Sequence, residues 1–285
     1  MLGLTLNSAA NIKRYFLAWS FISKAFELMQ ILLKVYPEHR DALICHREKP
    51  MLNPTAMLLA LADGKPASAF PLAALGQADP FGQVRQVAYL GADGLSAGIV
   101  QASGNYVVEH YPHIEMLIVH AGQISLQDEE RILVLGVGES VVIGRGTALR
   151  LQAEPGSLWA FSAMSQVSEG ATAGLTPLVP YVELKPSNGP DAQILISEAP
   201  QCRSHNAFVD GSNLLIGVWD STPYRRHARP HKVHELMHLL EGRVTLRLSD
   251  ATEMQVNTGD TVFVPQGTPC AWESSVYVRK LYVVN

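Results

Sequence analysis

Two stretches of the sequence repeat one pattern of short apolar segments, turn residues and glycines. HIEMLIVHAGQISL aligns with HELMHLLEGRVTL, which places Glu115 over Glu235 and Gly122 over Gly242. Further along, GESVVIGRGTALRL aligns with GDTVFVPQGTPCAW, and Gly138 falls on Gly259. Because the offset stays close to the length of one small domain, the repeat indicates two copies of the same β-rich unit.

The segments inside each copy are short, rich in β-branched residues and bounded by Gly, Asn, Asp and Pro. NYVVEHY, ESVVIG, LLIGVWDST and VYVRKLYVV are typical examples. Many short strands closed by turn residues are typical of an antiparallel sandwich or barrel. We therefore expect an all-β chain of two tandem barrels, with the first over residues 51–165, a Pro/Gly/Ser-rich linker over 166–190 and the second barrel over 191–285.

The composition narrows the classes of partner and compartment. Of the 285 residues, 47% are hydrophobic and 17% charged, as in ordinary globular proteins. A net charge of −4 argues against nucleic acid or an anionic membrane as the main partner. Cys45, Cys202 and Cys270 are odd in number and lack CxxC spacing, which argues against a disulfide framework and favours the reducing cytoplasm.

Residues 1–50 do not share the repeated pattern. They are apolar but interrupted by Lys24, Glu27 and Lys34, so the unbroken apolar run is too short to span a bilayer. Two interpretations stay open. The segment is either a helical N-terminal extension, or it lies outside the native protein and synthesis starts at Met51.

Two glycine-containing motifs in the second half resemble those of the cupin superfamily. Glu235 followed by six residues and Gly242 fits the first motif, and Gly259 followed by five residues and Pro265-Gln266-Gly267 fits the second. The chain resembles a bicupin, with its second half similar to the branch that contains the ureidoglycine aminohydrolase cupin domain. This resemblance implies two jelly-roll barrels. It says much less about activity, because cupins include enzymes, binding proteins and storage proteins.

The resemblance also implies a candidate metal site. The cupin ligands are two histidines, a glutamate and a histidine of the second motif, and three of these positions fall on His231, Glu235 and Cys270. The first falls on Arg229, which cannot bind a metal because its guanidinium stays protonated. We consider two alternatives: one divalent ion (Mn, Fe, Ni or Zn), or no metal, with Arg229 pairing with Glu235 or binding a substrate carboxylate.

Strand alternation predicts which side chains share the pocket with this set. Residues of odd number from 227 to 239 lie on one face of an uninterrupted strand, so His227, Arg229 and Met237 are expected to join Glu235 there. Trp219 and Tyr224 are expected at the pocket mouth. His234 and His238 fall on the opposite face, as outward or interface residues. A bulge near Pro230 would reverse the parity of the residues before it.

The first copy keeps Glu115 but has Tyr111 and Leu149 where the second has a histidine and Cys270, so the pocket is expected in the second copy. Two functions fit. One is an enzyme of amino- or ureido-compound metabolism, a metal-dependent aminohydrolase in which Glu235 and Arg229 are the catalytic residues. The other is a non-catalytic protein that binds a small molecule without metal. A homodimer is expected in either case, because exposed jelly-roll edges are commonly buried against a second copy.

Overall fold

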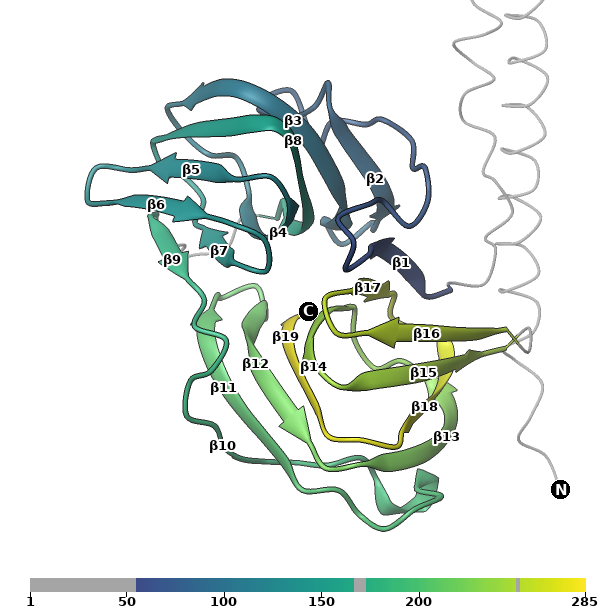
Figure 1. Ribbon diagram of the computed structural model, residues 1–285. Coiled ribbons are helices and arrows are strands. Elements are labelled where there is room, and N and C mark those ends of the chain that lie inside the picture. The colour runs from purple at the N-terminus through teal and green to yellow at the C-terminus, as the bar shows by residue number, and fades with distance from the viewer. Residues whose placement is uncertain (1–54, 167–172, 250–251) are drawn as a thin grey trace, which may run out of the picture. The chain divides into compact units, whose positions relative to one another are not determined.

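The computed structural model describes residues 55–166, 173–249 and 252–285. The described residues form β-strands, loops and one short 3-10 turn, η2 (Ala192–Ile194), so the prediction of an all-β chain is confirmed (Figure 1). The predicted N-terminal extension, residues 1–50, lies outside the described residues. No helix among the residues described is long and apolar enough to cross a membrane.

The N-terminal half is one eight-stranded antiparallel sheet that bends back on itself. Its strands are β2 (Arg85–Leu90), β3 (Leu95–Val108), β4 (Ile114–Ala121), β5 (Ile124–Gln127), β6 (Ile132–Leu135), β7 (Ser140–Ile143), β8 (Leu149–Met164) and β9 (Leu175–Pro177). The first part of β8 pairs with β5 and its last part with β4, while β3 follows β8 along both parts. One pair of long strands thus serves both faces of a sandwich.

The C-terminal half divides the same arrangement between two sheets, of seven and four strands, and the larger sheet includes β1 (Met57–Ala60), which precedes the N-terminal half in the chain. Its strands are β10 (Lys185–Ser187), β11 (Cys202–Val209), β12 (Leu215–Ser221), β13 (Tyr224–Pro230), β14 (Glu235–Glu241), β15 (Arg243–Leu248), β16 (Glu253–Asn257), β17 (Thr261–Val264), β18 (Pro269–Ser274) and β19 (Val278–Val284). The four-stranded sheet has the order β13-β18-β15-β16. The larger sheet has β14 and β19 near its centre.

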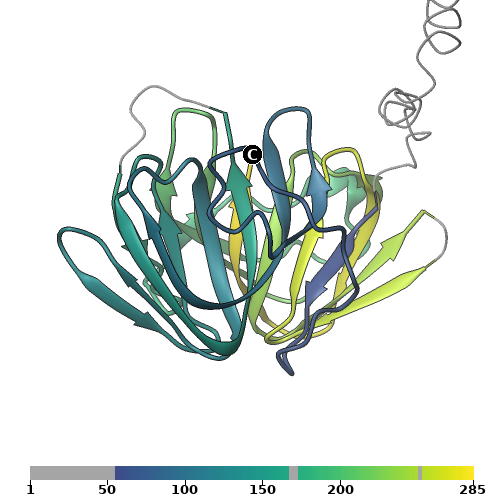
Figure 2. The ribbon, with the colours of Figure 1, turned by 90° about the horizontal axis from the view of Figure 1, so that it is seen from above.

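One strand lies beside the N-terminal half in the sequence but belongs to a sheet of the C-terminal half. β1 (Met57–Ala60) precedes the N-terminal half in the chain, yet it pairs with β17 of the C-terminal sheet, as the dark blue arrow in Figures 1 and 2 shows. β9, in the stretch expected to be a linker, pairs instead with β7 of the N-terminal half. β10, from the same stretch, pairs with β11. The boundaries at 165 and 191 stay predictions, but sheet membership does not follow chain order at β1.

Three apolar clusters hold this arrangement together. One fills the N-terminal half and another fills the C-terminal half. The third joins them, because side chains of β3, β4 and β8 pack with those of β12, β14 and β19, including Ile99, Met116, Ile216 and Leu236. β14 therefore buries alternate side chains on two sides, with Met237 inside its own half and Leu236 against the other.

The glycines aligned by the repeat occupy equivalent turns. Gly122 and Gly242 have φ of 69° and 81°, and Gly138 and Gly259 have φ of 84° and 87°. These values lie in the left-handed region that favours glycine. At Gly242 a Cβ would also stand 2.1 Å from the carbonyl oxygen of Tyr277, whereas at Gly138 it would meet nothing within 4 Å.

Replacing these two glycines with alanine separates backbone strain from crowding. Gly138→Ala is expected to cost about 1–2 kcal/mol through its φ alone. Gly242→Ala is expected to cost a further 1–3 kcal/mol or so, because the Tyr277 carbonyl must move. Urea unfolding measures both values, and equal losses in the two variants would contradict this assignment.

Two histidines and a threonine form a hydrogen-bonded chain where the halves meet. His238 Nδ1 lies 2.9 Å from Thr261 Oγ1, and His120 Nε2 lies 2.7 Å from the same oxygen. His120 Nδ1 is 3.1 Å from the carbonyl oxygen of Leu61, which can only accept, so Nδ1 carries the hydrogen. His120 Nε2 then accepts from the Thr261 hydroxyl, which in turn accepts from His238. His238 thus lies on the face of β14 opposite Glu235, as expected, but it is buried where the two halves meet and is not outward.

These hydrogen bonds require both histidines in their neutral form. Burial, with a smaller contribution from neighbouring His120, lowers the pKa of His238 to about 3, and burial also lowers the pKa of His120. Because the folded pKa lies below the unfolded value, the stability contributed by neutral His238 is complete above pH 6.5 or so. It is lost as the pH falls from there toward 3.

We therefore expect the free energy of unfolding to fall below pH 6.5, with His238 contributing up to about 1.4 kcal/mol per pH unit. His238→Asn keeps a donor for Thr261 but does not titrate, so its curve between pH 6.5 and 5 is expected to be flatter. Leu236→Ala serves as the control: it should lower the whole curve without changing the slope. Urea unfolding across this range tests both, and parallel curves for wild type and His238→Asn would refute the role given to His238.

Candidate functional site

A cavity of about 340 Å³ opens in the C-terminal half. Its walls come from β11, β12, β13, β14, β18 and β19, from the loop after β10 and from the loop between β13 and β14. Five residues expected at the site line it: Trp219, Tyr224, Arg229, His231 and Glu235. The other lining residues are Asn188, Gly189, Pro190, Cys202, Arg226, Lys232, Val233, Trp272 and Lys280. Chain segments far apart in the sequence thus converge on one hollow.

Glu235, the first residue of β14, is held between two basic side chains. Its Oε1 lies 2.6 Å from Lys280 Nζ, and its Oε2 lies 3.3 Å from His231 Nε2. The Lys280 and Glu235 side chains are only 7% and 13% exposed. Burial by itself raises the pKa of Glu235, but Lys280 and His231 outweigh it and hold the pKa well below the usual range. Glu235 is therefore a carboxylate at neutral pH.

An aromatic wall surrounds Lys280. Its Nζ lies 4.7 Å from the centre of the Trp219 ring and 5.3 Å from that of Trp272. The two indoles meet edge to face, and Tyr224 stacks on Trp272 with ring centres 5.6 Å apart. Ring faces attract a cation, so this wall stabilises the ammonium in a nearly dry position.

Two arginines also line the cavity. The pairing of β13 with β18 shifts register between Arg226 and Arg229, so both side chains face inward although their numbers differ in parity. Arg226 is buried and donates from Nη1 to the carbonyl oxygen of Cys270 at 2.8 Å. Arg229 has a buried Nε without a hydrogen-bond partner, and no carboxylate among the described residues lies within ion-pair distance of it.

Three of the residues expected at the site do not line the cavity. His227 is exposed, because the register shift turns it outward while Arg226 and Arg229 face in. Met237 shares the face of Glu235 but lies deeper, in the apolar core between the sheets. Cys270 is 1% exposed in the same core, and burial raises the pKa of its thiol. A bulge that would reverse the parity of the residues before Pro230 is therefore present in β13, and it places His227 outside the site.

Sequence reasoning missed Lys280, Arg226 and Trp272. Lys280 follows Arg279 in the final strand, VRKLYVV, which otherwise has no charged residue, and buried lysines are rare unless paired. That position was the signal available in the sequence. Arg226 gave none, because its inward direction depends on the register shift.

The residues at the site do not fit a divalent cation as they stand. No group of three or more His, Cys, Asp or Glu side chains in the described part of the chain is arranged to hold a metal ion. The strongest donor, Glu235, has one oxygen taken by an ammonium at 2.6 Å, and a metal beside that ammonium would be repelled. Cys270, with its raised pKa, is a poor source of thiolate.

The N-terminal half treats its equivalent glutamate in a similar way. Glu115 Oε2 lies 3.0 Å from Arg85 Nη2 and accepts a hydrogen bond from the Tyr111 hydroxyl at 2.9 Å. Arg85 also binds Asp79 at 2.8 Å, and its guanidinium lies 4.2 Å from the centre of the Phe161 ring. All four polar side chains of this cluster are buried or partly buried.

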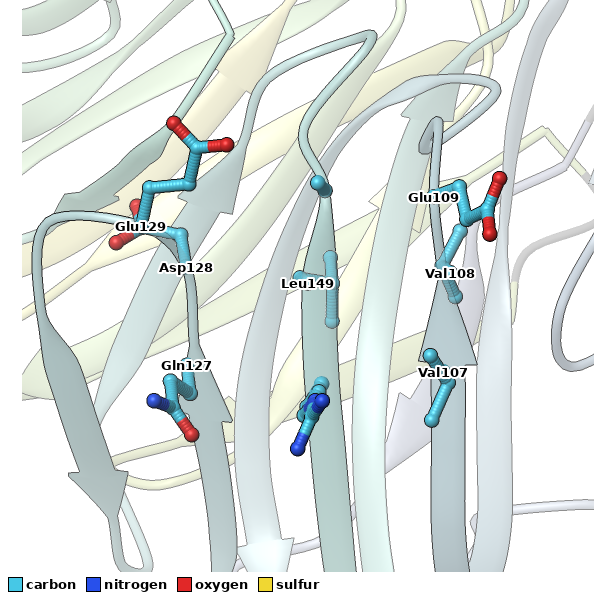
Figure 3. Close-up of a pocket in the computed structure, with 9 residues that line it drawn as sticks. Val107, Val108, Glu109, Gln127, Asp128, Glu129 and Leu149 are labelled. Carbon is cyan, nitrogen blue, oxygen red and sulfur yellow. The ribbon is translucent and has the colours of Figure 1, made fainter.

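A second hollow, of about 370 Å³, lies on the surface of the N-terminal half between β3, β5 and the start of β8. Figure 3 shows the carboxylates of Glu109, Asp128 and Glu129 around one end of it and Val107 and Gln127 toward the other. It contains none of the residues expected at the site. The C-terminal cavity is therefore the candidate functional site.

Similarity to known proteins identifies the class. Residues 211–282 match the EutQ-like cupin domain family. A protein of unknown function from Pseudomonas syringae pv. tomato, of the DUF861 family, is 50% identical, with 81% of this chain and 100% of that chain covered and a TM-score of 0.79. The protein is therefore a cupin. More narrowly, the chain belongs to the DUF861 family.

Two more distant structures are also similar. The cupin 2 conserved barrel domain protein from Leptotrichia buccalis is 13% identical, with 70% of this chain and 86% of that chain covered and a TM-score of 0.49. The protein Ylba from E. coli, also of the DUF861 family, is 15% identical, with 86% and 97% covered and a TM-score of 0.46. No curated protein matches the chain. The cupin prediction is confirmed, while the ureidoglycine aminohydrolase branch stays a prediction.

Proposed function

We propose that the protein binds a small anionic molecule in the cavity of its C-terminal half, without a bound metal. The observation that carries this proposal is Arg229, a cation that reaches the cavity with no carboxylate of the described residues within ion-pair distance. A buried guanidinium N–H without an acceptor is costly, and a ligand carboxylate supplies the acceptor in a geometry that guanidinium favours.

The charge of the cavity supports an anionic ligand. Arg226, Arg229, Lys232 and Lys280 line it, and within the described part of the chain Glu235 is the only carboxylate that does so. Since Lys280 and His231 already bind both oxygens of Glu235, the two arginines remain to hold an incoming anion. The chain as a whole carries a net charge of −4, so the positive charge is concentrated here.

The aromatic wall and the size of the cavity indicate the rest of the ligand. A volume of about 340 Å³ suits a small metabolite. Trp219 and Trp272 offer apolar surface to a planar group, such as a ring or a ureido group, held by its carboxylate at the arginines. A carboxylate with a planar body therefore fits both the arginines and the indoles that line the cavity.

The enzyme alternative keeps one observation in its favour. His231 Nδ1 is held by the carbonyl oxygen of Val233 at 2.9 Å, which fixes the ring with Nε2 toward Glu235. A fixed imidazole beside an ionised carboxylate is an arrangement that can move protons. A hydrolase of amino or ureido compounds, related to the ureidoglycine aminohydrolases, would use this pair next to a carboxylate held by Arg229. Release of ammonia from such a compound, lost in Glu235→Gln, would favour this alternative.

Calorimetric titration with benzoate and with N-carbamoylglycine tests the binding proposal, and the corresponding neutral amides serve as matched controls. We expect the carboxylates to bind and the amides to bind at least tenfold more weakly. Arg229→Ala should weaken carboxylate binding by about 10- to 100-fold, the size of one charge-assisted hydrogen bond. Arg225→Ala, which removes an exposed arginine of the same strand, should leave carboxylate binding unchanged.

Equal affinity for acid and amide, or full affinity in Arg229→Ala, would contradict the proposal. So would the absence of any binding by either carboxylate at millimolar concentration.

A further inference from the structure

Glu115 and Glu235 occupy the same place in the two halves. Each lies at the start of the central strand, β4 or β14, and pairs with the last residue of the neighbouring strand, Ile143 of β7 or Val264 of β17. Both side chains point into their own half. A carboxylate at this depth needs a counter-charge, because an unpaired one costs far too much to bury.

The counter-charge comes from different strands in the two halves. In the C-terminal half it is Lys280 of β19, which pairs with Leu239 and Trp219. The corresponding N-terminal residue, which pairs with Val119 and Val100, is Trp159. That half instead brings in Arg85 from β2. A side-chain cation at this glutamate has thus arisen from two unrelated positions, which indicates that the cation itself is the requirement.

In the C-terminal half, the side chains that could bind a metal ion are already arranged for a cation. The hydrogen bond from His231 Nδ1 to the Val233 carbonyl directs Nε2 at Glu235 Oε2, 3.3 Å away. A backbone carbonyl on the far nitrogen is also how metal-binding histidines are oriented. Lys280 Nζ, 2.6 Å from the other oxygen of Glu235, occupies the space beside that oxygen that a bound ion would need.

We infer that the Lys280 ammonium is a tethered cation that takes the place of a divalent metal at Glu235 and His231, and that it keeps the metal out. Arg85 has the same role at Glu115. The C-terminal half therefore contains a latent metal site, for a first-row ion such as Co²⁺ or Zn²⁺, that Lys280 closes. This inference is independent of whether the cavity binds an anion.

Replacing the ammonium with a neutral ligand tests the inference. Lys280→His removes the charge and offers a third donor beside His231 and Glu235. Lys280→Arg keeps a cation and is the matched control. Each protein, purified without a metal-affinity tag, is titrated with CoCl₂ and with ZnCl₂ by calorimetry. Cobalt absorption reports direct nitrogen and oxygen coordination, and circular dichroism checks the fold.

We expect Lys280→His to bind one equivalent of Co²⁺ at least about 100-fold more tightly than wild type or Lys280→Arg, since three donors form a site where two do not. Adding Glu235→Ala to Lys280→His should abolish this binding. A folded Lys280→His protein with no gain in affinity would overturn the inference.

Metal analysis of the wild-type protein gives an answer even if Lys280→His does not fold. Stoichiometric manganese, iron, nickel or zinc that disappears in Glu235→Ala would show that Lys280 does not exclude a metal. A metal-free wild type is the expected result. Neither outcome alters the benzoate titration, so failure of this inference is distinguishable from failure of the proposed anion binding.

Discussion

The ion pair between Lys280 and Glu235 is the interaction on which the candidate site depends. Both side chains are almost completely removed from water, at 7% and 13% exposure, and their charged atoms are 2.6 Å apart. Burying either charge alone would cost several kcal/mol or more. Their mutual attraction, the second contact of Glu235 with His231 and the two indole rings around Lys280 offset that cost. Because Lys280 and His231 balance the negative charge of Glu235, the arginines determine the net charge of the cavity.

The contact between the halves keeps this pair in position. β14 carries Glu235 and Met237 on the side of its own half, and Leu236 and His238 on the side of the other. Because side chains alternate along a strand, the packing that fixes one face also fixes the other. β1 adds to β17, the neighbour of β14, so a segment before the N-terminal half supports the site of the C-terminal half. Glu235 and Lys280 are thus held by central strands of the larger sheet, while His231 and residues 188–190 reach the site from loops.

Alternation and repetition made much of this predictable from the sequence. The aligned glycines lie at equivalent turns with positive φ, and Glu235, His231, Trp219 and Tyr224 share a cavity as expected. These features depend on local periodicity or on turns that only glycine tolerates easily. They can therefore be predicted from the sequence of a single strand or hairpin.

What could not be predicted depends on distant pairing. Lys280 meets Glu235 only because β19 pairs with β14, and neither segment's sequence predicts that pairing. The register shift in β13 reversed the direction of His227 and brought Arg226 inward, an effect of one local irregularity. Cys270 illustrates a third limit. Its position in the cupin motif matched a ligand, yet its side chain belongs to the apolar core.

A double-mutant cycle on Lys280 and Glu235 tests the central claim most directly. The free energy of unfolding is measured by urea titration at pH 7 for wild type, Lys280→Met, Glu235→Gln and the double variant. Each single change leaves one buried charge unpaired, so each is expected to cost about 3–5 kcal/mol. The double variant should be more stable than the sum of the single losses predicts, by about 2 kcal/mol or more. Additive losses would show that the two side chains do not neutralise one another, and the account of the site would fail with them.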